Sequence, residues 1–339
     1  MSVQGEGIAL GGTPIPVSTL NVTENGTYTP SAGAAYNVVN VNVEQPFSFV
    51  VKGSGSFTTS GDINVNFGDT SSDYSGNNQT VNFSYNDEKA HRVVATGNLT
   101  NISFQNCTGL LSVDVPFPRS MRYTSSLNSC FKNCASLTSI PIGLFDNCPA
   151  VTSFDSCFRG CTSLTSIPAG LFDNCTAARF LYSCFQGCTS LTAIPSGLFD
   201  NCTTVTNFDS CFQSCTSLTS IPAGLFDNCT AVTSFGGCFN NCASLTTIPS
   251  GLFDNCTAVT TFNSCFNSCA LLTEIPAGLF DNCAAVTSFS SCFFGCRALM
   301  GLAPGLWDTT KWPNVTLHSM CFYNCTGLSN YADIPSDWK

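Results

Sequence analysis

Apolar side chains recur at fixed intervals along about two thirds of the chain, from about residue 104 to residue 331. A typical set is Phe131, Cys134, Leu137 and Ile140, and the same residue types return at intervals of 27 residues. One column of cysteines shows the period directly: Cys130, Cys157, Cys184, Cys211, Cys238, Cys265 and Cys292. A period of this length predicts a solenoid, in which each unit buries its apolar edge against its neighbours.

The 27-residue unit, here called a rung, divides into related halves of 14 and 13 residues. Cys157, Phe158, Cys161 and Leu164 lie at i, i+1, i+4 and i+7, which predicts one or two helical turns with one buried face. The residues that follow are β-branched and predict a short strand, which the next proline ends. The predicted fold is therefore mainly β with short helical turns, in a solenoid that occupies residues 99–339.

Residues 1–46 form a separate, light segment rich in glycine and valine. Asn25-Gly26 stands between β-forming residues, which predicts a hairpin, and the valines of residues 38–43 predict another strand. Because this segment is too small for a good core, we expect it to act as an N-terminal β attachment segment.

Residues 47–98 alternate apolar and polar positions, which predicts a small all-β domain of the β-sandwich type. The expected strands fall within residues 47–51, 63–67, 81–85 and 92–95, and residues 71–79 read as a polar loop. Asp69 is expected to stabilise the turn before that loop through its own side chain, with a Ca²⁺ site as the alternative. The chain thus divides into residues 1–46, 47–98 and 99–339.

The chain is poor in charge. Only 9% of its 339 residues are charged, the net charge is −10, and no basic run occurs. This composition argues against nucleic-acid and anionic-membrane partners. No stretch reaches the roughly 18–20 apolar residues of a membrane span, and residues 1–20 lack the basic start and apolar run of a signal peptide.

The 23 cysteines could indicate disulfides, zinc or a reduced core. Their number is odd, and each stands in a repeat column beside phenylalanine and leucine, where free cysteine behaves as a small buried hydrophobe. Zinc would require pairs at compatible spacing or histidine partners, and the pair Cys157 and Cys161 recurs without histidine. We therefore expect stacked, reduced thiols and no metal.

The sequence predicts no catalytic site and no cofactor. His91 and His318 lie in different regions, and no group that could activate a cysteine recurs beside the cysteine columns. One aspartate column is the most charged feature, and it is expected either to cap local backbone N–H groups or to form weak cation sites. Its members are Asp146, Asp173, Asp200, Asp227, Asp254 and Asp281.

Candidate binding residues come from columns in which the rungs differ. The residue after each Cys-Phe pair is expected to project outward, and this column includes Arg159, Gln186 and Phe294. One rung also departs from the pattern Val-Thr-Ser-Phe-Asp, because it reads Ala-Arg-Phe-Leu-Tyr over residues 178–182. Exposed aromatic residues beside arginine are typical of interface anchors, whereas drift at a neutral position is the alternative. The candidates here are Arg179, Phe180 and Tyr182.

The repeat resembles a known family. The segment from Val205 to Ile221 reads Val-Thr-Asn-Phe-Asp-Ser-Cys-Phe-Gln-Ser-Cys-Thr-Ser-Leu-Thr-Ser-Ile, and it is similar to the leucine-rich repeats of BspA-like bacterial surface proteins. The period of 27 and the second Phe-Asp-Asn-Cys half depart from that pattern. The resemblance implies a leucine-rich-repeat-type solenoid, display outside a cell or particle, and binding of proteins or glycans rather than chemistry.

Two weaker resemblances concern the N-terminal parts. Residues 20–30, Leu-Asn-Val-Thr-Glu-Asn-Gly-Thr-Tyr-Thr-Pro, resemble a module of phage and prophage structural proteins. Residues 66–69, Asn-Phe-Gly-Asp, with His91-Arg92-Val93-Val94 resemble PKD-type β domains, although Phe67 replaces the usual tryptophan.

These observations lead to a non-enzymatic surface-display protein. The main hypothesis is a phage virion component, such as a fibre, tail tip or head decoration, assembled in the host cytoplasm. Its solenoid would bind a host-surface protein or glycan, and residues 1–46 would bind another virion or surface protein. The alternatives are an adhesin on the bacterial cell surface and a structural decoration without a ligand; a homo-oligomer is left open.

Overall fold

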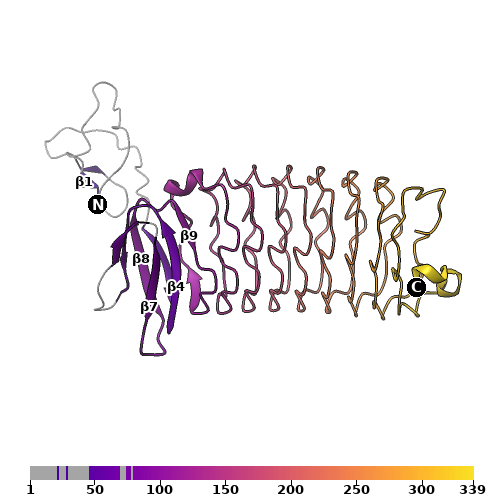
Figure 1. The fold of residues 1–339 in the computed structure, drawn as a ribbon, viewed down its shortest axis with the longest axis horizontal. Coiled ribbons are helices and arrows are strands. Elements are labelled where there is room, and N and C mark those ends of the chain that lie inside the picture. The colour runs from indigo at the N-terminus through magenta and orange to yellow at the C-terminus, as the bar shows by residue number, and fades with distance from the viewer. Residues whose placement is uncertain (1–20, 23–27, 30–45, 69–73, 78) are drawn as a thin grey trace, which may run out of the picture. The chain divides into compact units, whose positions relative to one another are not determined.

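The computed structural model describes residues 21–22, 28–29, 46–68, 74–77 and 79–339, and the chain forms two compact units, 1–46 and 47–339 (Figure 1). In the first unit, β1 (Asn21–Val22) and β2 (Tyr28–Thr29) pair in antiparallel fashion, which confirms the two strands of the predicted hairpin. The Asn25-Gly26 turn, the strand predicted at 38–43 and Asp69 lie outside the described residues.

The second unit begins with two antiparallel sheets. One has the strand order β10-β3-β8-β5-β6 and the other β7-β4-β9. The strands are β3 (Phe47–Val51), β4 (Ser54–Ser60), β5 (Ile63–Asn66), β6 (Tyr74–Gly76), β7 (Thr80–Ser84), β8 (His91–Gly97), β9 (Asn101–Ser103) and β10 (Leu110–Val113).

The sheets pack against each other through buried aromatic residues. The ring of Phe49 on β3 meets the ring of Phe57 on β4 edge-on, with centroids 5.0 Å apart. The alternating patterns correctly predicted β3, β5, β7 and β8. The prediction of a polar loop over residues 71–79 is wrong at β6, which is an edge strand without a fully buried residue and therefore has no apolar alternation to detect.

The sheets continue directly into the repeats. Ser112 of β10 pairs in antiparallel fashion with Val50 of β3 and forms a parallel bridge with Ser139 of the following rung. The buried ring of Phe104 lies 4.8 Å from that of Phe49 and 5.5 Å from that of Phe131. One apolar core therefore runs from the β sheets into the rungs, and a boundary at residues 98–99 stays a prediction.

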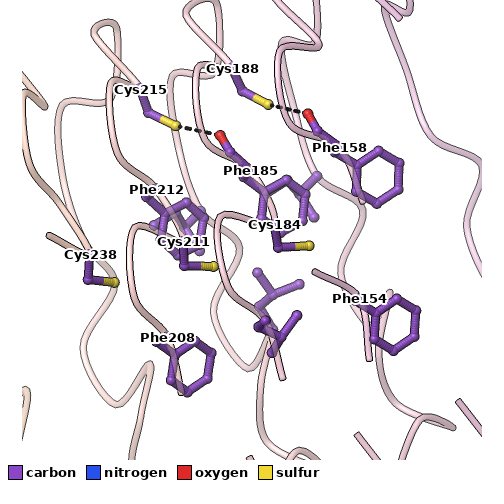
Figure 2. Packing of buried hydrophobic residues seen from close by; sticks show 14 of the residues in the cluster. Phe154, Phe158, Cys184, Phe185, Cys188, Phe208, Cys211, Phe212, Cys215 and Cys238 are labelled. Atoms are coloured by element: carbon purple, nitrogen blue, oxygen red, sulfur yellow. Dashed lines mark hydrogen bonds between the residues drawn. The ribbon is translucent and has the colours of Figure 1, made fainter. Parts of the chain in front are cut away.

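Successive rungs lie on one another in sequence order (Figure 1). The rings of Phe158, Phe185 and Phe212 are buried, nearly parallel, and separated by 5.4 and 5.5 Å (Figure 2). Parallel bridges join equivalent residues 27 apart in most rungs, as between Ser126 and Ser153. The predicted stacking in register is confirmed, although each predicted strand is reduced to a single bridged position.

The backbone within each rung alternates between two kinds of hydrogen bond. The N–H groups of Ser129, Phe131 and Asn133 donate to carbonyl oxygens of the next rung, at 2.7–2.9 Å. The N–H groups between them close turns, as the N–H of Lys132 does by donating to Ser129 O at 3.0 Å. Around each Cys-Phe pair every second N–H is used between rungs, and in the other half the N–H groups of Asp146 and Cys148 bond to residues three positions back. Neither half has the i→i−4 bonds of an α-helix, so the predicted helical turns are wrong. The described repeats contain consecutive four-residue turns closed by i→i−3 hydrogen bonds instead.

Left-handed residues explain how such turns follow one another so closely. The residue before each Cys-Phe pair has a positive φ, for example 56° at Ser156, and so does the residue three positions after that cysteine, for example 72° at Gly187. Non-glycine residues rarely adopt this conformation, and isolated left-handed positions interrupt any helix. The spacing of the buried residues is the same as in a helix, so the spacing alone could not reveal these turns.

The far end of the stack is closed by a different structure. Trp338 lies in the 3-10 helix η4 (Ser336–Trp338), is buried, and stacks on the ring of His318 at 4.5 Å. The carbonyl oxygen of Trp338 accepts the N–H of Phe322 at 2.8 Å, which replaces the missing next rung. Two other 3-10 helices are η2 (Arg119–Tyr123) and η3 (Tyr331–Asp333). Among the described residues, no helix has the length and apolar character to cross a membrane.

Candidate binding surface

One outward face of the stack carries an inter-rung ladder of side-chain acceptors. Asn128 Oδ1 accepts the N–H of Asp155 at 3.0 Å, and Asp155 Oδ1 accepts the N–H of Tyr182 at 2.9 Å. Asp209 Oδ1 likewise accepts the N–H of Gly236 at 2.6 Å. An Asn or Asp in this column therefore ties its rung to the next, which the sequence pattern did not reveal.

Tyr182 occupies a position in this ladder and cannot act as such an acceptor. The N–H of Asp209, one rung later, is satisfied instead by Oδ1 of Asn207 at 2.8 Å. The same compensation follows Gly236, because the N–H of Asn263 donates to Thr261 Oγ1 at 3.2 Å. Weaker local bonds of the same kind, at 3.4 Å, accompany the intact ladder at Asp155 and Gly236, so the local acceptor supplements the ladder where it is present and stands alone where it is lost.

The substituted rung exposes a basic and two aromatic side chains. Phe180 is 44% exposed and Tyr182 is 48% exposed, and Arg179 is also exposed. Within the described part of the chain, Arg179 forms no ion pair. The neighbouring Leu181 is fully buried in place of the usual phenylalanine. The candidates Arg179, Phe180 and Tyr182 are thus all exposed within four consecutive residues of one rung, here called the 179–182 patch.

The other three candidates stand in a different column. Arg159 is exposed, whereas Gln186 is half-buried and its side-chain amide donates to Gln213 Oε1 of the next rung. Phe294 is half-buried and stacks on Tyr323 with ring centroids 5.0 Å apart. Phe294 lies four rungs beyond Gln186 in the repeat, so the structure does not bring it to the 179–182 patch.

The aspartate column does not act as predicted. Among the described residues, the carboxylates from Asp146 to Asp254 accept no backbone N–H, and Asp281 binds Lys311 Nζ at 2.8 Å. Each carboxylate instead lies over the glycine three positions before it: a Cβ added to Gly143, whose φ is 70°, would be 2.5 Å from Asp146 Oδ2. No three His, Cys, Asp or Glu side chains of the described residues are arranged to hold a metal.

The cysteines are free, buried thiols, as expected for a reduced core. Figure 2 shows two of them donating S–H to phenylalanine carbonyl oxygens of the preceding rung: Cys188 to Phe158 at 3.3 Å, and Cys215 to Phe185 at 3.2 Å. Burial raises the pKa of the Cys148 and Cys161 thiols to about 12. Since the thiolate is the nucleophile, these groups are not poised for covalent catalysis.

The S–H···O hydrogen bond of Cys215 is expected to contribute to stability. Replacing Cys215 with alanine is expected to lower the free energy of unfolding by about 1–2 kcal/mol, because a buried sulfur and its hydrogen bond are lost. Cys229→Ala is the matched control, since its sulfur is equally buried but lies 3.9 Å from Phe199 O. Denaturant titration should give the larger loss for Cys215; equal losses would show that the S–H···O contact contributes nothing.

Comparison with known proteins agrees with the geometry of the repeats. A model of the BspA type leucine-rich repeat region matches the chain in 6 copies, over residues 82–194 and 156–299. The matched residues extend over more than half of the chain and include the 179–182 patch. A search of curated proteins found no match.

Proposed function

Because the chain belongs to the BspA-type leucine-rich repeat family, we propose that it is a non-enzymatic adhesion protein displayed on a bacterial cell surface. Proteins with such repeats are generally exposed at surfaces, and stacked repeats offer a long, regular face for binding other molecules. In this proposal, residues 99–339 present the binding surface and residues 1–46 attach the protein to another surface protein.

The observation that carries the binding role is the 179–182 patch. Tyr182 replaces an Asn or Asp that would tie its rung to the next, so the exposed ring contributes nothing to that ladder. Phe180 similarly exposes an apolar ring at a column that elsewhere holds mostly Ser, Thr or Asn. Tyrosine, phenylalanine and an unpaired arginine are residue types that anchor interfaces. The proposed ligand is a host-surface protein or a glycan.

The virion hypothesis has less support. The family match concerns a bacterial repeat type, and the phage-like module lies largely outside the described residues. Its attachment to a virion, the resemblance of residues 47–98 to PKD-type domains and self-association all stay predictions. Binding by Arg159, Gln186 and Phe294 is a separate proposal. Gln186 and Phe294 are half-buried and contact the next rung, which supports a binding role less well than the exposure of the 179–182 patch does, whereas Arg159 is exposed.

A variant with the patch returned to the repeat pattern tests the proposal. Arg179→Thr, Phe180→Ser and Tyr182→Asn together should leave the melting temperature nearly unchanged, because the new residues occur at these columns in other rungs. Binding to an array of printed glycans and extracellular proteins should fall about 10- to 100-fold, as expected when interface anchors are removed.

The matched control changes the same face four rungs away. Thr287→Ala with Ser290→Ala alters the columns of Arg179 and Tyr182 without touching the patch. This control should bind like the unmodified protein. If the patch variant also binds with unchanged affinity, the exposed aromatic residues reflect neutral drift and the site is excluded.

A further inference from the structure

The native stack uses its cysteines in the reduced form. All 23 are free and buried, and they form three columns that run through consecutive rungs. The columns are Cys130, Cys157, Cys184, Cys211, Cys238, Cys265, Cys292 and Cys321; Cys107, Cys134, Cys161, Cys188, Cys215, Cys242, Cys269, Cys296 and Cys325; and Cys148, Cys175, Cys202, Cys229, Cys256 and Cys283. In the second column, the S–H groups from Cys134 onward donate to phenylalanine carbonyl oxygens at 3.0–3.3 Å. A disulfide in this column would remove the donor hydrogen.

The folded stack protects these thiols. Oxidation requires contact with an oxidant and the thiolate form, and both are suppressed when the sulfur is buried. Burial raises the pKa of Cys215 and Cys269 to about 12, and it also raises the pKa of Cys184 well above its ordinary value. A disulfide reagent therefore reaches these sulfurs only when rungs separate or unfold.

The unfolded chain has the opposite property. Its thiols have ordinary pKa values of about 8.5 and are all exposed, so disulfides form readily in an oxidising environment. The rungs are nearly identical in sequence, so a cysteine of one rung meets equivalent partners in every other rung. Each such bond holds two rungs in a relationship that the native stack does not use. An oxidised chain is thus trapped in many wrong registers.

We propose that this protein completes its folding in a reducing compartment and meets an oxidising environment only as a folded stack. The inference goes beyond the adhesion role and does not depend on it, because it rests on the burial and hydrogen bonding of the thiols. The order of folding and oxidation therefore decides the outcome. Reduced chains fold and become resistant to oxidants, whereas chains oxidised before folding do not reach the native state.

Refolding of the full chain tests the proposal. Protein unfolded in guanidinium chloride with reductant is desalted and diluted either into dithiothreitol or into oxidised glutathione. In the second buffer, two protein thiols become one disulfide while one oxidised glutathione is reduced to two glutathione molecules. Near-ultraviolet circular dichroism and the mass after iodoacetamide alkylation report the native fraction and the free thiols.

We expect nearly full recovery in dithiothreitol and at least a fivefold lower recovery in oxidised glutathione. Adding dithiothreitol to the trapped sample should restore the native signal, which distinguishes disulfide trapping from aggregation. Folded protein kept in oxidised glutathione should retain its free thiols over the same period. Equal recovery in the two buffers, rapid loss of thiols from the folded protein, or failure of dithiothreitol to rescue the trapped sample would overturn the proposal.

Discussion

Replacing Phe212 with alanine is expected to lower the free energy of unfolding by about 3–5 kcal/mol, because the change leaves a cavity inside a closely packed core. The ring of Phe212 is fully buried and lies between the rings of Phe185 at 5.5 Å and Phe239 at 5.6 Å. Neither neighbouring ring can move to fill this cavity, because each is held in place by its own rung.

Amide hydrogen exchange is the appropriate measurement, because long repeat arrays need not unfold in a single transition. Protection should fall most in the rungs that contain Phe185, Phe212 and Phe239. Phe180→Ala makes the same chemical change at a ring that is 44% exposed, and it should cost about 1 kcal/mol or less. Similar losses for the two variants would contradict the role of the phenylalanine columns as the core of the stack.

Phe104→Ala should destabilise the β sheets and the first rungs together, by about 3–5 kcal/mol. Phe104 is fully buried and its ring contacts Phe49 and Phe57 in the sheets as well as Phe131 in the stack. Because one side chain completes both cores, its removal creates a cavity that neither part can close alone. Gln105→Ala, at the exposed neighbouring position, is the control and should be nearly neutral.

Hydrogen exchange again distinguishes the possible outcomes. A joint loss of protection at amides of β3 and of the rung that contains Phe131 would indicate that the two parts fold as one cooperative unit. A loss confined to the sheets, or to the rung, would instead support separate folding units divided near residues 98–99.

The repeat architecture could be predicted because the buried columns appear in the sequence as the same residue types at a fixed interval. Phe158, Cys161 and Leu164 have the same residue types at the equivalent positions of the other rungs, and the structure buries each of them. The local backbone could not be predicted from the same pattern. Left-handed serine at Ser156 and inter-rung hydrogen bonding from alternate N–H groups are tertiary effects, and the spacing of apolar residues does not distinguish them from a helix.

The candidate site was predictable only where the repeat failed. The irregular residues 178–182 identified Phe180 and Tyr182 as outward-facing, and both are exposed. The role of Asn207 could not be inferred from the sequence. Its side chain accepts the N–H of Asp209, and this role becomes visible only when the structure shows that Tyr182 lacks the acceptor oxygen that other rungs supply. The aspartate column was misassigned because an Asp near a turn usually caps a backbone N–H, whereas here it lies over a left-handed glycine.

The pairing of Ser112 with both Val50 and Ser139 determines how one end of the parallel ladder is closed. A ladder of parallel bridges has two open ends, and each open end is a template on which another molecule can add. At β10 the direction of pairing reverses, so the ladder meets an antiparallel sheet that offers no matching continuation. The antiparallel sheets therefore occupy this end of the parallel ladder, and we expect that a second stack of rungs does not add to the chain at β10.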